Sequence, residues 1–176
     1  MVAERFVTQL NAQIGNELAS HNQYLACAIY YDALTLPQMA AFFYRQAAEE
    51  RDHAMMMVRY LLDTDQKVEI PAVPAVVNDF ADVVAPVALA LEQEKRVTDQ
   101  ISSLYRTARE EVDFASEQFL GWFIREQVEE VATMSDLLAV VERNQNELEQ
   151  LEAYVARETG SGGADPTAPA VAGAGG

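Results

Sequence analysis

Glu50 and His53 are the residues whose types and spacing most directly suggest chemistry. Side chains three positions apart are neighbours on a helix, so this carboxylate and this imidazole can bind one metal ion. Glu17, Glu94 and Glu130 stand in other segments, each at a position where the apolar pattern calls for a core residue. Buried carboxylates without partners are costly, and a metal pair is the best reason for keeping all of them.

The elements that must position these residues are helices. Apolar core positions recur every three or four residues, and few glycines interrupt them before Gly160. Pro37 suits the first turn of a helix, where its missing amide hydrogen is not needed. The pattern predicts four long helices and a short fifth one: about 4–33, a second from Pro37, a third around 87–108, a fourth around 120–141, and 147–158.

The stretch from Lys67 to Asp82 is predicted to be an extended connection. It holds Pro71 and Pro74 among β-branched residues, a composition that disfavours a helix. It is long enough to cross a bundle from end to end. The expected fold class is therefore all-α, a four-helix bundle with one long crossover and a short fifth C-terminal helix.

Spacing along the second predicted hairpin shows that two of the acids can meet. Residues equally far from a tight turn lie at one level in an antiparallel helix pair. Glu94 and Glu130 each lie 18 residues from Val112. At 1.5 Å per residue, both are expected roughly 27 Å from the turn.

The first hairpin brings its acids to a similar level. Glu17 and Glu50 lie 18 and 15 residues from Thr35, a difference of about one helical turn. Four helices thus send a carboxylate inward near mid-height, and His53 adds an imidazole. Such ligands suit Fe, Mn or Zn, and the single cysteine, Cys27, rules out a four-thiolate site within one chain.

Composition limits the classes of partner. The 176 residues include 28 acidic and 12 basic side chains, a formal charge of -16 that opposes binding to nucleic acid. No apolar run approaches the roughly 18 residues of a membrane span, and the N-terminus does not look like a secretion signal. We expect a soluble cytoplasmic protein with no nucleic-acid or membrane partner.

The chain is expected to hold one domain, residues 1–159. Residues 160–176 are mostly Gly, Ala and Pro, which bury too little apolar surface to offset the entropy of ordering, so a disordered tail is predicted. Three roles stay open for this tail: it is inert, it lies at a symmetry axis, or it docks the protein to a larger compartment.

From about Glu4 to Glu158 the chain resembles the ferritin family, most closely the bacterial haem-free type. Several motifs in the family's order carry the resemblance: Asn16-Glu17 with Tyr24, Glu49-Glu50-Arg51-Asp52-His53-Ala54, Gln93-Glu94-Lys95, and Trp122-Phe123 followed by Glu126-Gln127-Val128-Glu129-Glu130. The resemblance implies a homo-oligomeric shell of twenty-four subunits. It also implies a ferroxidase, which oxidises Fe(II) with oxygen or peroxide and stores the Fe(III) mineral inside the shell.

The resemblance also assigns roles to residues. Glu17, Glu50 and His53 would hold the first of two irons, and Glu50 would bridge to a second iron held by Glu94 and Glu130.

Residues beside the pair have implied roles as well. Gln127 would lie close by as a weak or indirect ligand, and Tyr24 would hydrogen-bond near the site and supply an electron. Glu49, Glu126 and Glu129, together with Glu130, match acids of a third iron site in bacterial ferritins, although on spacing alone the first three could be ordinary surface acids.

Departures from related families narrow the prediction. Bacterioferritins have a second Glu-x-x-His where this chain has Gln127 to Glu130, and their haem-binding methionine would fall at Arg51. No haem is therefore predicted, and Met55 to Met57 are interpreted as core packing. A rubrerythrin-like protein would need four cysteines in an iron module, and the single cysteine of this chain rules that out.

Two other functions compete with iron storage. A soluble di-iron oxidase acting on an organic substrate uses the same kind of bundle, and a non-catalytic helical interaction module would carry these acids incidentally. Two polar residues keep their own alternatives. His21 is interpreted as a core histidine with a hydrogen-bond partner, and Glu117 either lines a pore between subunits or is a solvated acid.

Overall fold

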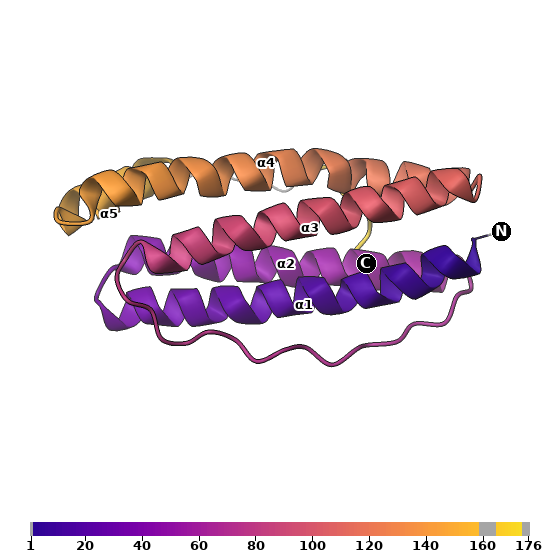
Figure 1. The fold of residues 1–176 in the computed structure, drawn as a ribbon, viewed down its shortest axis with the longest axis horizontal. Helices are drawn as coiled ribbons and strands as arrows, with labels where there is room; N and C mark the ends of the chain where they lie inside the picture. Colours follow the sequence, from indigo (N-terminus) through magenta and orange to yellow (C-terminus); the bar gives the residue numbers. More distant parts are fainter. Residues whose placement is uncertain (1, 159–164, 174–176) are drawn as a thin grey trace.

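The structure, a computed structural model, describes residues 2–158 and 165–173, and the helices within these ranges confirm the predicted fold class. Helices α1 and α2 form one antiparallel hairpin, α3 and α4 form a second, and α5 packs at one end against α2 and α4 (Figure 1). None of these helices is long and apolar enough to cross a bilayer. Their bounds are α1 Glu4–Ala33, α2 Pro37–Asp63, α3 Ala85–Glu110, α4 Phe114–Asn144 and α5 Leu148–Glu158.

The two hairpin turns lie where the spacing argument placed them. Thr35 and Val112 have φ angles of 60° and 55°, the left-handed conformation that ends a helix and reverses the chain. The next helix begins at once after Val112, because the Asp113 carboxylate accepts a hydrogen bond from the Ser116 amide at 3.1 Å. The turn centres used to compare the levels of the acids are therefore confirmed.

The apolar core is divided into two clusters along the bundle. One cluster lies toward the α1–α2 turn and includes Tyr24, Phe43 and Met134. The other lies toward the α3–α4 turn and includes Phe6 and Ile101. Buried polar residues stand between them, in chain position, on every long helix. Six of these we call the polar layer: Glu17, Glu50, His53, Glu94, Gln127 and Glu130.

The crossover, residues 64–84, runs along the length of the bundle beside α1 (Figure 1). Gln23 of α1 holds it in place by donating to the Val77 carbonyl and accepting from the Val77 amide, both at 2.8 Å. Gly15 lies beneath it, and a Cβ at this position would come within 2.4 Å of Pro71 Cγ. The absence of a side chain at Gly15 thus lets the crossover pack directly on α1.

Residues 165–173 depart from the prediction of a disordered tail. They lie against the bundle, with Asp165 accepting a hydrogen bond from Trp122 of α4 and the Ala172 amide donating to the Met55 carbonyl of α2. The overall composition of a segment does not reveal the few residues in it that make specific contacts. The remainder of the predicted tail falls outside the described residues.

Replacing Gly15 with Ala should destabilise the protein although Ala is the better helix former. The gain in helix propensity is about 1 kcal/mol, whereas overpacking against a proline ring costs about 1–3 kcal/mol. We expect a lower midpoint of thermal unfolding at fixed protein concentration.

Gly121→Ala is the matched control, since nothing lies within 4 Å of a Cβ added there in α4. This substitution should raise the midpoint. Equal shifts of the same sign for both variants would contradict the account of Gly15.

Candidate metal centre

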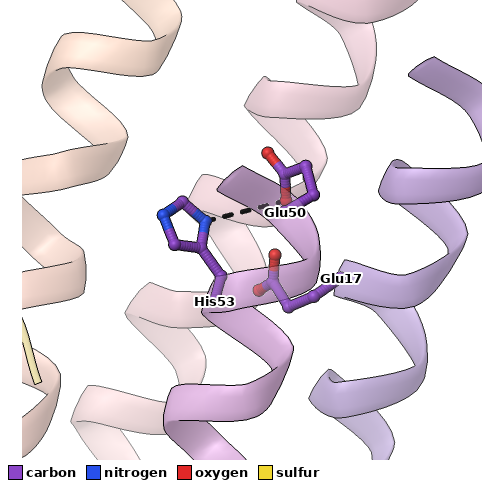
Figure 2. A group of neighbouring side chains, drawn as sticks. All are labelled: Glu17, Glu50 and His53. Atoms are coloured by element: carbon purple, nitrogen blue, oxygen red, sulfur yellow. Dashed lines mark ion pairs between the residues drawn. The ribbon is translucent and has the colours of Figure 1, made fainter. Parts of the chain in front are cut away.

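Glu17 of α1 and Glu50 and His53 of α2 form the compact part of the site. Their side chains point toward one another in the space between the helices (Figure 2). All three are buried, and one ligand atom from each lies within 4.8 Å of the others. His53 Nδ1 lies 3.7 Å from Glu50 Oε2. Two carboxylates and an imidazole at these distances can bind one metal ion.

Gln13 orients the first of these carboxylates. Its Nε2 donates to Glu17 Oε1 at 2.8 Å, and it stands four residues earlier on the same face of α1. Glu17 Oε2 is buried and has no hydrogen-bond partner. One oxygen is therefore fixed by the protein and the other is free to bind a cation. Gln13 is not among the residues predicted from the sequence, although its spacing of four residues from Glu17 is a usable signal.

Glu94 of α3 is held by two donors from other helices. The Tyr24 hydroxyl of α1 donates to Oε1, and Gln127 Nε2 of α4 donates to Oε2 at 3.1 Å. The carboxylate is fully buried. Tyr24 and Gln127 thus both donate hydrogen bonds to Glu94, one of the predicted ligands, and their roles in the chemistry stay predictions.

Glu130 of α4 completes the set of inward-facing acids. It is buried and interacts electrostatically with Glu94, Glu49 and Glu126. Neither Glu94 nor Glu130 belongs to the compact group around His53. The structure therefore assembles one half of the predicted pair tightly and keeps the other half within electrostatic range.

The carboxyl groups of the polar layer are hard to ionise without a cation. Burial is the main cause that raises the pKa of Glu17, Glu50 and Glu130 well above the ordinary value. Their mutual repulsion raises these pKa values further, through Glu50 for Glu17 and through Glu94 for the other two. Burial also raises the pKa of Glu94, while the hydrogen bonds from Tyr24 and Gln127 lower it. A bound cation would favour the ionised forms.

Three further acids lie near this layer. Glu49 and Glu129 are exposed, while Glu126 is half-buried. Burial raises the pKa of Glu126, His53 lowers it, and Glu129 and Glu49 raise it again. Glu49 and Glu129 are thus electrostatic neighbours of Glu126, which also interacts with His53.

Two other predicted residues have defined partners. His21 lies with Nδ1 2.6 Å from the Ala47 carbonyl, which confirms a histidine satisfied by the core. Glu117 accepts hydrogen bonds from Arg109 at 2.8 Å and from Tyr105 at 3.0 Å. These contacts lower the pKa of Glu117, with Arg109 the first cause, so this acid is paired within its own chain.

Comparison of the chain with known proteins shows its family. Residues 7–144 match the Ferritin-like domain. The chain belongs to the ferritin family. It is 49% identical over 169 residues to ferritin BfrB of Mycolicibacterium smegmatis, covering 96% of this chain and 93% of that protein. It is 36% identical over 132 residues to a bacterial non-heme ferritin of Staphylococcus aureus, covering 75% and 80%.

Solved ferritins share its fold. An open-pore ferritin from the archaeon Archaeoglobus fulgidus superposes with a TM-score of 0.84 at 30% identity, covering 88% of this chain and 96% of that one. A humanized archaeal ferritin gives a TM-score of 0.87 at 27% identity, covering 93% and 100%. The resemblance drawn from the sequence motifs is confirmed. The absence of haem stays a prediction.

In this ferritin, Glu50→Gln should stabilise the metal-free protein at pH 8. Because the pKa of folded Glu50 is raised, the folded state retains its proton where the unfolded state has lost it. The free energy of unfolding therefore falls as pH rises from the ordinary value of 4.5 through the folded pKa. A glutamine avoids this loss, so we expect a gain of about 1–3 kcal/mol at pH 8.

Chelator-treated samples unfolded at pH 5 and pH 8 measure this gain. The advantage of the variant should be smaller at pH 5. Glu92→Gln is the control, because Glu92 is exposed on α3 and should show little change at either pH. A Glu50→Gln variant no more stable than wild type at pH 8 would contradict the account.

Proposed function

We propose that this ferritin is a cytoplasmic iron-storage protein with ferroxidase activity. In this proposal it oxidises Fe(II) at a two-iron centre within each subunit and stores the product as a ferric oxo-hydroxide mineral inside a shell of twenty-four subunits. One observation carries the proposal: the polar layer places four carboxylates and one imidazole between two apolar clusters. Membership in the ferritin family supports iron storage.

The first iron would bind to Glu17, Glu50 and His53. The donor set fits Fe(II), which accepts both carboxylate oxygen and imidazole nitrogen. The unpartnered Glu17 Oε2 supports this fit, since a buried oxygen without a hydrogen bond is costly unless a cation binds it. Glu50 belongs to this group and also interacts electrostatically with Glu94.

The second iron would bind between Glu50, Glu94 and Glu130. Glu94 already has its two oxygens held by Tyr24 and Gln127, so its position is fixed before iron arrives. Glu130 would turn toward Glu94 when the second iron enters. Glu50 would then bridge two metals about 3.5–4 Å apart, the spacing of paired-metal sites.

Iron binding would begin with loss of protons from the carboxyl groups. Metal ligands must be deprotonated, so Fe(II) displaces the protons that burial retains in the empty site. Each Fe(II) then gives up one electron. A pair reduces one dioxygen to hydrogen peroxide, or one hydrogen peroxide to water, with uptake of two protons. Where only one Fe(II) is bound, Tyr24 would supply the second electron in its place and would give up its hydroxyl proton toward Glu94, to which it is hydrogen-bonded.

Ferric iron would leave past the three outer acids. Glu126 is the half-buried member beside His53, and Glu49 and Glu129 are exposed. Carboxylates graded from buried to exposed give iron successive oxygen ligands on the way to the surface. In our proposal they form a third iron site, which favours release of iron over a permanently bound pair.

Removing the bridge and the imidazole together should abolish the fast phase of iron oxidation. In Glu50→Ala with His53→Ala, the first iron loses two of its three ligands and the second loses the shared one. We expect the initial rate in air, followed by absorbance of the ferric product, to fall at least about tenfold.

Glu92→Ala with Asp136→Ala is the control, since both acids are exposed and lie off the polar layer. It should oxidise iron at the wild-type rate. If the Glu50→Ala, His53→Ala variant oxidised iron as fast as this control, the result would favour a non-catalytic helical module over a ferroxidase.

The native mass should distinguish a storage shell from a small di-iron oxidase. Twenty-four copies of a 19.5 kDa chain have a mass of about 470 kDa. Light scattering coupled to gel filtration should give this value for the metal-free protein. A monomer or dimer over the whole concentration range would favour the oxidase that acts on an organic substrate.

A further inference from the structure

The C-terminal segment 165–173 is hydrogen-bonded to α2, which carries His53, and to α4, whose Trp122 contacts His53. At one end Trp122 Nε1 of α4 donates to Asp165 Oδ2 at 2.8 Å. At the other end the Ala172 amide donates to the Met55 carbonyl of α2 at 3.1 Å. Met55 lies two residues beyond His53 on α2. The segment therefore spans the two helices that enclose the imidazole.

Trp122 is the link between this segment and the metal centre. Its ring packs against His53 at 5.5 Å between centroids and an interplanar angle of 72°, an edge-to-face contact. It packs at 5.0 Å and 89° against Phe123, which also contacts His53. A ring in edge-to-face contact restricts the plane its neighbour can adopt. The orientation of the indole therefore bears on the orientation of the imidazole.

Asp165 holds the indole by its one polar group. The Trp122 side chain is buried, and a buried indole N–H needs an acceptor. Asp165 is itself held in place, because both the amide and the hydroxyl of Thr167 donate to its carboxylate at 2.8 Å. The hydrogen bond from Trp122 is the first cause that lowers the pKa of Asp165, so the acceptor is ionised near neutral pH.

Apolar contacts hold the rest of the segment in place. Ala168, Val171 and Ala172 pack against the apolar cluster that contains Trp122. These contacts, together with the Ala172 hydrogen bond, hold the segment against the bundle and so keep Asp165 beside Trp122. The carboxylate thus acts from a docked segment.

We propose that Asp165 is a positioning residue for the iron centre. It fixes the indole of Trp122, and the indole in turn fixes the plane of the His53 imidazole for metal binding. This inference rests on the proposed function, since it takes His53 as an iron ligand. Groups behind the ligands set the orientation of metal-bound histidines and influence metal affinity.

Trp122 is the single tryptophan of the chain, so its fluorescence reports this contact directly. In metal-free Asp165→Ala the indole loses its acceptor, and we expect red-shifted emission and stronger quenching by acrylamide. Asp165→Asn keeps a carbonyl acceptor and should stay near wild type. Asp136→Ala, an exposed acid on the same helix as Trp122, is the matched control and should not change the emission.

Metal affinity is the second readout, with Co(II) as the probe followed by its visible absorption. Asp165→Ala should weaken Co(II) binding about three- to tenfold, and Asp165→Asn no more than about twofold. The same Asp165→Ala change should have no further effect in a Trp122→Phe background, where the N–H donor is already gone. A full additional loss there would overturn the proposal.

The remaining outcomes are also decisive. Wild-type emission and affinity in Asp165→Ala would overturn the positioning role, and so would an Asp165→Asn variant as defective as Asp165→Ala. Failure of the proposed function gives a different result: the wild-type protein itself would bind no Co(II) at this centre and would oxidise Fe(II) no faster than the Glu50→Ala, His53→Ala variant.

Discussion

The burial of four carboxyl groups at one level is the constraint on which the rest of this ferritin depends. Ionised carboxylates in an apolar interior repel one another and lose hydration, and burial accordingly raises the pKa of each. Neutral donors relieve part of the cost: Gln13 binds Glu17, while Tyr24 and Gln127 bind Glu94. Protons neutralise the remaining negative charge when the site is empty, and cations neutralise it when the site is filled.

In this fold, separate features fix the level of each acid along the bundle and the orientation of the ligand side chains. The turns at Thr35 and Val112 fix how far each acid lies from the end of its hairpin. The apolar clusters on either side of the polar layer exclude water from it. Orientation comes from side chains behind the ligands, and in our proposal it reaches His53 from the chain's far end, through Asp165 and Trp122.

Local, periodic features of the sequence predicted the fold and much of the site. The first helix has the predicted bounds, and the acids on the apolar seams of α1 to α4 are buried. The orienting role of Gln13 and the contact of Asp165 could not be predicted, because both depend on which side chains meet in three dimensions. Asp165 was obscured further by its surroundings, since a Gly-, Ala- and Pro-rich composition says nothing of one carboxylate that finds a buried indole.

Anomalous scattering at the iron edge from crystals loaded anaerobically with Fe(II) tests the central claim most directly. The account predicts two peaks in every subunit: one among Glu17, Glu50 and His53, and a second about 3.5–4 Å away on the side of Glu94 and Glu130. A polar layer without iron, in crystals that hold iron elsewhere, would contradict it.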